Sequence, residues 1–193
     1  MSSREAAQWQ AGGEAPRDDV IAWAAMELAD VPELSPEPFD VHALVGEAEA
    51  RYQPVAREKG LSFEVKLAAS VPRRALGEET WLRTVLAGLI DNAVRFTDAG
   101  EVVASVTADP TSGARILLHA EVSDTGCGMP TEAVRTLFRQ SGARFNGRDE
   151  LDGGGSLRVC GRLIDLMDGR IGASSALGMG TTAWFTVPLD LPA

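Results

Sequence analysis

Two kinds of apolar periodicity alternate along this chain after Asp40, and their order limits the folds that are open to it. Three segments carry apolar residues at helical spacing, beginning near Asp40, Glu79 and Leu157. Between and after them, short segments alternate apolar and polar residues, as half-buried strands do, most clearly in LSFEVKL from Leu61 to Leu67. The order is helix, strand, helix, hairpin, glycine-rich loop, helix and hairpin. This order predicts an α/β two-layer sandwich, in which a mixed, mostly antiparallel sheet is covered by about three helices on one face.

Capping and turn residues set the expected bounds of these elements. Asp40 is a suitable N-cap for the first helix, and Gly60 ends it. The second helix is expected from Glu79 to Val94, and the third ends at Gly169. A short helical stretch is expected around residues 131–139. The strands are expected at residues 61–67, 101–107, 115–123, 170–174 and 181–187.

The first 35 residues lack this regular pattern. Residues 1–18 are polar and aperiodic, which is typical of a flexible leader, and residues 20–29 favour a short helix. Three prolines between residues 32 and 38 disfavour helix, so an extended linker is expected there. We therefore divide the chain into a leader, short helix and linker in residues 1–35 and one globular domain in residues 36–193.

Composition excludes several classes of function. Apolar residues make up 45% of the 193 residues and charged residues 24%, the balance of a soluble globular protein. The net charge of −10 argues against nucleic acid or an anionic membrane surface as a partner. The longest apolar stretch, Val20–Met26, is far shorter than the roughly 20 residues that span a bilayer. Two cysteines, Cys127 and Cys160, are too few for a disulfide framework and favour a cytoplasmic location.

A first cluster of polar residues lies on the second helix. Gly88, Asn92 and Arg95 share one face because they are four and three residues apart. Asn92 offers a neutral oxygen suited to a Mg²⁺ ion that phosphates already hold, and Arg95 suits phosphate oxygens. Taken alone, the triplet is explained better by a solvated helix face.

A second cluster, DTGCGM from Asp124 to Met129, directly follows a strand. A carboxylate at a strand end accepts a hydrogen bond from an exocyclic amine such as that of adenine. Gly126 and Gly128 let the backbone approach a ring without side-chain collision. An ordinary turn is the alternative explanation.

Two more glycine-rich segments follow. Residues 152–156, DGGGS, open the third helix, where exposed N–H groups and the helix N-terminus favour a phosphate. A surface loop with a serine cap explains this segment equally well. Residues 178–182, GMGTT, are a hairpin turn on their own.

Together, in this order and on these elements, the clusters resemble the catalytic ATP-binding domain of sensor histidine kinases. The segment LAGLIDNAVRFT, residues 86–97, resembles the asparagine box commonly written N-x-x-x-N-A-x-K-F-T, and DTGCG matches the first glycine box. Residues 137–138 resemble the start of the phenylalanine box. The segments LMDGRI and GMGTT resemble the family's closing motifs, and PEPFD resembles a common start of the domain. The resemblance covers residues 36–189.

The resemblance implies the Bergerat, or GHKL, fold with ATP and Mg²⁺ bound in a side pocket. It implies a lid in residues 139–153, and a γ-phosphate that passes to a histidine on a separate dimerisation hairpin, with a response regulator as a further partner. Carried over by position, the implied site residues are Asn92 as Mg²⁺ ligand, Arg95 against phosphate, Asp124 on the adenine amine, Gly126, Gly128 and Met129 along the base, Gly154, Gly155 and Leu157 in the phosphate-binding segment, and Thr182 supporting Asp124 through water.

Three positions depart from the family pattern. Gly88 replaces the first asparagine of the helical box, which removes a polar group and costs about 1 kcal/mol of helix stability relative to alanine. Ser141 replaces the second phenylalanine of the phenylalanine box. The usual GTGLGL segment is DGGGSL, in which Asp152 repels a triphosphate unless it turns outward or an arginine offsets it.

The chain offers no phosphoacceptor of its own. His42 and His119 lack the sequence context of an acceptor helix, so both are expected to be structural. Residues 20–29 resemble the end of the acceptor hairpin's second helix. A degenerate Bergerat-fold module, which docks a response regulator or partner kinase without turning over ATP, is the alternative function, favoured by Gly88 and Asp152. An anti-sigma serine kinase of the same fold predicts a base at position 88, where glycine stands.

Overall fold

One mixed sheet with helices on a single face organises the described part of the chain, residues 35–137 and 154–192 of a computed structural model. Its elements in chain order are β1 (Glu37–Asp40), α3 (Val41–Glu58), β2 (Ser62–Leu67), β3 (Arg74–Gly77), α4 (Glu79–Phe96), β4 (Glu101–Pro110), β5 (Arg115–Asp124), α5 (Thr131–Thr136), α6 (Gly154–Leu166), β6 (Arg170–Ser175) and β7 (Thr181–Asp190).

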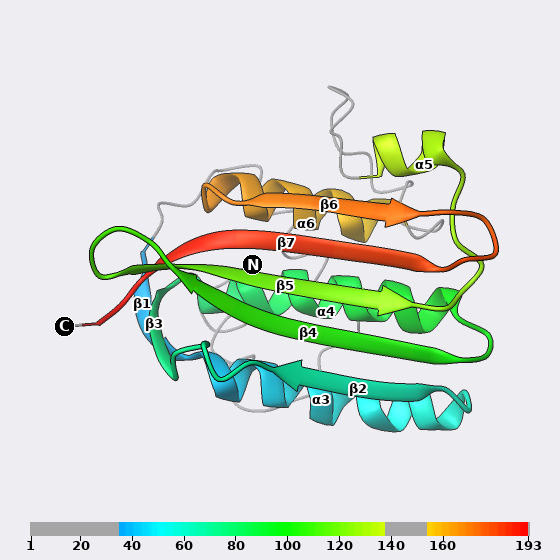
Figure 1. The fold of residues 1–193 in the computed structure, drawn as a ribbon, viewed down its shortest axis with the longest axis horizontal. Helices are drawn as coiled ribbons and strands as arrows, with labels where there is room; N and C mark the ends of the chain where they lie inside the picture. Colours follow the sequence, from blue (N-terminus) through cyan, green and yellow to red (C-terminus); the bar gives the residue numbers. More distant parts are fainter. Residues whose placement is uncertain (1–34, 138–153, 193) are drawn as a thin grey trace, which may run out of the picture. The chain divides into compact units, whose positions relative to one another are not determined.

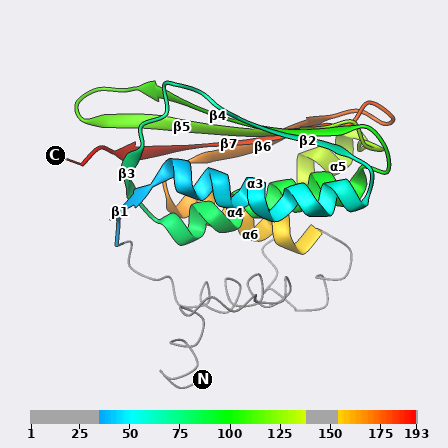
Figure 2. The ribbon, with the colours of Figure 1, turned by 90° about the horizontal axis from the view of Figure 1, so that it is seen from below.

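The strands lie in the order β1-β3-β7-β5-β4-β2, and β6 also pairs with β7. All pairings are antiparallel except the parallel pairing of β2 with β4. Figure 1 looks onto the sheet, and Figure 2 shows α3, α4 and α6 together beneath it. The predicted two-layer sandwich with a mostly antiparallel sheet is therefore confirmed.

The predicted caps and apolar stripes account for the helices. Asp40 is the N-cap of α3, and its Oδ1 accepts a hydrogen bond from the N–H of Ala43 at 2.9 Å. Gly60 follows the helix with φ of 74°, a conformation that glycine adopts readily. The buried positions of α4 follow the expected helical period: Leu82, Val85, Leu86, Leu89, Ile90, Ala93 and Val94.

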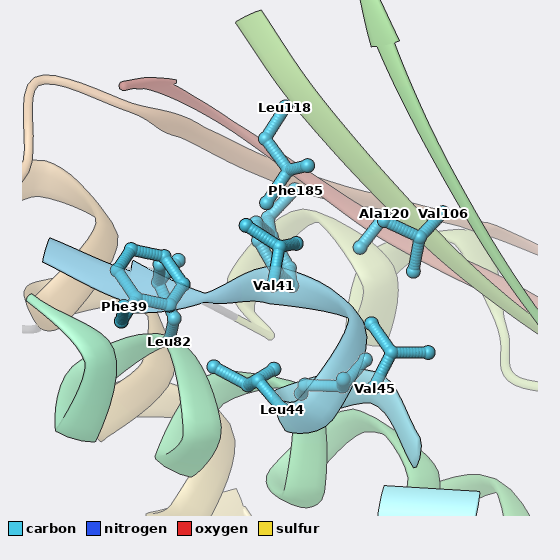
Figure 3. A pocket seen from close by; sticks show the side chains of 10 residues that line it. Phe39, Val41, Leu44, Val45, Leu82, Val106, Leu118, Ala120 and Phe185 are labelled. Carbon is cyan, nitrogen blue, oxygen red and sulfur yellow. The ribbon is translucent and has the colours of Figure 1, made fainter. Parts of the chain in front are cut away.

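The core lies between this helical layer and the inner face of the sheet. Alternate residues of the central strands β5 and β7 point toward the helices, and each strand continues this alternation to its end. A small apolar space remains between α3, α4 and the sheet, and Figure 3 shows the side chains around it. Its lining is Phe39, Val41, Leu44, Val45, Leu82, Leu86, Val106, Leu118, Ala120 and Phe185. Because every lining side chain is apolar, the space is a packing feature of the core and not a polar ligand site.

The sequence pattern missed two short strands. Residues 37–40 were expected within an extended linker and domain start, but they form β1, which pairs with β3 from Glu37↔Gly77 to Asp40↔Arg74. Phe39 is 4% exposed and belongs to the core. Each of these strands has four residues, too few for a period of two to stand out in the sequence.

Several predictions fall on residues outside the described ranges. They include nearly all of the leader in residues 1–35, the lid in residues 139–153, and the departures at Ser141 and Asp152. The short helix expected around residues 131–139 is present as α5 within its described portion. Among the described helices, none has the length and apolar character needed to cross a membrane.

Candidate functional site

Asp124 lies at the end of the sheet where β5 and β6 end and β7 begins. It is the last residue of β5, opposite Thr181 at the start of β7, and β6 ends beside them at Ser175. Figure 1 shows this end of the sheet, with α5 close to the end of β6. Because Asp124 continues the inward alternation of β5, its side chain lies on the face that the helices cover, and it is 9% exposed.

One oxygen of the Asp124 carboxylate has both of the backbone hydrogen bonds that fix this side chain. Oδ1 accepts from the N–H of Gly126 at 2.8 Å and from the N–H of Thr181 at 3.2 Å. Burial raises the pKa of the Asp124 carboxyl above its ordinary value, and these two N–H groups oppose the rise. Since neither bond uses Oδ2, the arrangement fixes the carboxylate while leaving an acceptor oxygen for a ligand N–H.

Two loops meet beside this carboxylate, and we call them the loop pair: residues 125–129 after β5 and residues 176–180 between β6 and β7. The N–H of Gly178 donates to the carbonyl oxygen of Cys127 at 2.7 Å. The N–H of Met129 donates to Ser175 Oγ at 2.8 Å. The two loops are therefore joined directly, and one cannot move without disturbing the other.

Two glycines of the loop pair allow backbone contacts that no side chain would permit. Gly128 has φ of 64°, and a Cβ there would lie 2.0 Å from the carbonyl oxygen of Ala176. Gly180 has φ of 80°, and a Cβ there would lie 1.9 Å from the carbonyl oxygen of Asp124. Both positions thus require glycine for conformation and for space.

The C-terminal end of α4 abuts the first loop. The carbonyl oxygen of Phe96 accepts a hydrogen bond from the N–H of Cys127 at 3.3 Å. A Cβ on Gly126 would lie 2.3 Å from the same oxygen. On the other side of this helix end, Lys59 Nζ donates to the carbonyls of Val94 at 2.7 Å and Arg95 at 3.1 Å, where a cation is favoured by the helix dipole.

Asn92 lies four residues, or about 6 Å along the axis of α4, before Phe96, whose carbonyl oxygen contacts the first loop. The side of α4 that it shares with Gly88 faces α6, because a Cβ on Gly88 would lie 2.8 Å from Cys160 Sγ. Asn92 is half-buried. Within the triplet, Gly88 packs against α6, whereas Arg95 is exposed.

Arg95 lies at the rim of this end of the molecule. Its guanidinium carbon is 5.5 Å from the centroid of the Phe96 ring, within the range of a cation–π contact. Arg95 directly precedes Phe96, whose carbonyl oxygen contacts the first loop.

The N-terminus of α6 points to the same end. α6 runs antiparallel to β6, to which a short turn at residues 167–169 joins it, so its first residues lie toward Ser175, as Figure 1 shows. Gly154 and Gly155 are its first two residues, where backbone N–H groups have no partner within the helix. Leu157 is 1% exposed, so its side chain packs inside instead of facing a ligand.

Thr182 does not lie where the resemblance to the family placed it. Its hydroxyl is 2.9 Å from Ser123 Oγ, on the face of the sheet opposite to the Asp124 side chain. Thr181 is the residue whose N–H reaches Asp124. The alternation of β7 contains the signal for this, since Thr181 has the same parity as the buried residues Ala183 and Phe185.

The two histidines lie away from this end, in keeping with structural roles. The Nε2 atom of His42 donates to the carbonyl of Val71 at 3.0 Å. The ring of His119 meets that of Trp184 edge to face at 6.2 Å. Within residues 35–137 and 154–192, no group of three His, Cys, Asp or Glu residues is placed to hold a metal ion.

A family model described as "Histidine kinase-, DNA gyrase B-, and HSP90-like ATPase" matches residues 77–191. Sensor histidine kinase AruS of Pseudomonas aeruginosa is 35% identical over 178 residues, which are 90% of this chain and 18% of that protein. The aerobic respiration control sensor protein ArcB of Escherichia coli is 32% identical, over 91% of this chain and 22% of its own length. This chain therefore spans about a fifth of the length of these relatives.

Solved structures agree with these matches. Full-length ShkA in complex with AMPPNP aligns with a TM-score of 0.71 and 29% identity, over 91% of this chain and 37% of that one. The catalytic domain of histidine kinase ThkA aligns with a TM-score of 0.58 at 19% identity, over 80% of this chain and 95% of that domain. At that identity the ThkA likeness shows the fold alone.

Proposed function

Since the chain belongs to the histidine kinase-, DNA gyrase B- and HSP90-like ATPase family and is a catalytic ATP-binding domain of the sensor histidine kinase type, we propose that it binds Mg-ATP at Asp124 and Asn92 and donates the γ-phosphate to a histidine outside this chain. ShkA, whose structure contains AMPPNP, supports the choice of nucleotide. The histidine-containing dimerisation domain and a response regulator are the proposed partners, and the cytoplasm is the proposed location.

The observation that carries the proposal is that the backbone hydrogen bonds to the Asp124 carboxylate use one of its two oxygens. Two backbone N–H groups donate to Oδ1 and fix the orientation of the carboxylate, and neither of them bonds to Oδ2. An exocyclic amine supplies the N–H donor that this oxygen needs, and adenine carries one. Gly126, Gly128 and Met129 would line the base, and the two glycines let the first loop pack closely against Phe96 and Ala176 beside it.

The phosphates would lie toward the helices. Asn92 faces the α6 side of α4, and the first N–H groups of α6 at Gly154 and Gly155 favour an anion. Mg²⁺ supplies charge neutralisation when it is bound, and a site with one protein oxygen fits an ion that keeps phosphate and water ligands. Arg95, exposed at the rim, would contact the outer phosphate oxygens.

A binding module without ATP turnover is the second candidate, and one observation favours it. Position 88, where the family motif has a polar side chain, faces Cys160 so closely that a Cβ would lie 2.8 Å from its Sγ. The loss of that polar group is therefore accommodated in the packing of α4 on α6. A module that does not turn over ATP tolerates the loss of a polar side chain at position 88, and this loss does not alter the residues of the loop pair that would bind the base.

A nucleotide titration tests the proposal. We expect the chain to bind Mg-ATP with micromolar affinity in isothermal titration calorimetry, and Asp124→Asn to weaken binding about 100-fold, because it loses a charged hydrogen-bond acceptor. Asp109→Asn is the matched control, since Asp109 is exposed near the opposite end of β4 and its loss changes net charge equally. No binding by the unaltered chain at millimolar ATP would favour the binding module instead.

A further inference from the structure

We propose that Ser175, the last residue of β6, is a positioning residue for base recognition by Asp124. The proposal rests on the function proposed above and assigns a role to a side chain that does not touch the nucleotide. It is carried by three hydrogen bonds that meet at one hydroxyl group.

The Ser175 hydroxyl has a defined direction because its hydrogen-bonding capacity is filled. It donates its proton to the carbonyl oxygen of Gly180 at 2.9 Å. It accepts from the N–H of Met129 at 2.8 Å. The hydroxyl of Thr181 lies 2.9 Å away and, since the Ser175 proton is already used, Thr181 is the donor in this contact. One donor and two acceptor positions are thus all occupied.

Two of these bonds act on the peptide group that holds Asp124. The carbonyl of Gly180 and the N–H of Thr181 belong to the same planar peptide. Ser175 binds this peptide at its oxygen, and the N–H at its other end donates to Asp124 Oδ1 at 3.2 Å. The Thr181 hydroxyl, also bonded to Ser175, fixes the same residue a second time. Loss of the Ser175 hydroxyl therefore removes two hydrogen bonds that constrain the peptide and side chain next to the carboxylate.

The third bond acts on the first loop instead of on the Gly180–Thr181 peptide. Met129 follows Gly128 at the end of the first loop, and its N–H is anchored only through Ser175 Oγ among the bonds of the described residues. Ser175 thus connects the acidic group that reads the amine with the loop that lines the ring. Such a residue affects recognition of the base and leaves the contacts of the phosphates unchanged.

The experiment compares three ligands with and without the amine. Mg-ATP carries the exocyclic amine, Mg-ITP has a carbonyl in its place, and Mg-tripolyphosphate has no base. Binding of each is measured by calorimetry for the unaltered chain, Ser175→Ala and Ser174→Ala. Ser174 is the matched control because it precedes Ser175 on the same strand, is exposed, and faces away from Thr181.

We expect Ser175→Ala to weaken Mg-ATP binding about tenfold, to reduce the preference for ATP over ITP to about twofold, and to leave tripolyphosphate binding unchanged. Ser174→Ala is expected to match the unaltered chain. An unchanged ATP-to-ITP ratio in Ser175→Ala overturns the proposal, and so does an equal loss for all three ligands, which indicates a general structural defect.

A second variant keeps the test decisive if Ser175→Ala does not fold. Thr181→Val keeps the side-chain shape and the N–H to Asp124 but removes the hydroxyl that bonds Ser175. We expect a smaller loss of ATP-over-ITP preference, about threefold, and no loss overturns the proposal. Failure of the proposed function has a different signature: the unaltered chain itself then binds no ATP, or binds ATP and ITP equally.

Discussion

The two ends of the candidate site are built by different means. At the loop pair, backbone groups make nearly all of the contacts: two N–H groups fix Asp124, and glycines bring the loops within carbonyl contact. At the helix pair, which we define as α4 and α6, Asn92 is a half-buried polar residue of α4, and Gly88, four residues before it, packs against Cys160 of α6.

This difference separates two ways of losing function. The loop pair is tied to the register of β5 and β7, because Asp124 and Thr181 are paired residues of the sheet. A change there disturbs the fold along with the site. A change on the facing surfaces of α4 and α6 alters side chains at a packed interface and leaves the sheet intact. Of the departures from the family pattern, the one that falls on a described residue, Gly88, lies on the helix side.

The largest expected effect tests how tightly the loop pair is packed. Gly180→Ala adds a Cβ 1.9 Å from the carbonyl oxygen of Asp124 at a φ of 80°, so backbone must move. We expect it to lower the free energy of unfolding by about 3 kcal/mol or more. Gly178→Ala is the matched control, because φ is 73° but no atom lies within 4 Å, and about 1 kcal/mol is expected. Urea denaturation measures both, and equal losses would mean that the loop pair is looser than its contacts indicate.

The next effect tests whether the helix pair is adapted to glycine at position 88. Gly88→Ala gains about 1 kcal/mol of helix propensity but places a Cβ 2.8 Å from the buried Cys160 Sγ. We expect a net loss of about 1 kcal/mol in the free energy of unfolding, because Cys160 is fully enclosed. In a Cys160→Ala background the same change is expected to stabilise by up to about 1 kcal/mol.

Gly46→Ala on α3 is the control for helix propensity in this cycle. No atom lies within 4 Å of its added Cβ, so it isolates the propensity gain. If Gly88→Ala stabilises the unaltered chain as much as Gly46→Ala does, the contact with Cys160 exerts no constraint, and the contrast between the two ends loses half of its support.

The sequence predicted the loop pair better than the helix pair, and the reason is the range of the contacts. Asp124, Gly126 and Gly128 form a contiguous motif after a strand, so their proximity follows from the chain itself. The reason for glycine at position 88 depends on Cys160, which lies on another helix. Nothing in the sequence pattern indicates that these two residues meet. The hydrogen bonds of Ser175 are equally hidden, because Gly180 reaches it only when β6 pairs with β7, and Met129 only when β5 also pairs with β7.

The apolar and polar alternation of the last strand disagrees with the position that the family resemblance implied for Thr182. The apolar residues Ala183 and Phe185 face inward, so the same parity assigns Thr181 to the Asp124 side and Thr182 to the outer face. The two strands β1 and β3 are a different case. Their four residues each contain too little alternation, and their pairing at the edge of the sheet depends on chain folding around α3.

The smallest expected effect concerns pH, and it distinguishes the carboxylate of Asp124 from the helix pair. Burial raises the pKa of Asp124 above its unfolded value of 3.8, so in the ligand-free chain its contribution to stability is present at low pH and is lost as pH rises through the folded-state pKa. Nucleotide binding has the opposite sign, because the ionised carboxylate is a stronger acceptor for the amine than the protonated carboxyl group. We expect Mg-ATP affinity to fall by less than about tenfold from pH 7 to pH 5, with ITP, which lacks the amine, affected less.

Calorimetry at several pH values measures the nucleotide affinity. Unfolding curves of the unaltered chain and of Asp124→Asn at the same pH values measure the pH dependence of stability. If ATP and ITP lose affinity equally, protonation of the phosphates accounts for the change, and the pH dependence belongs to the helix side instead of to Asp124.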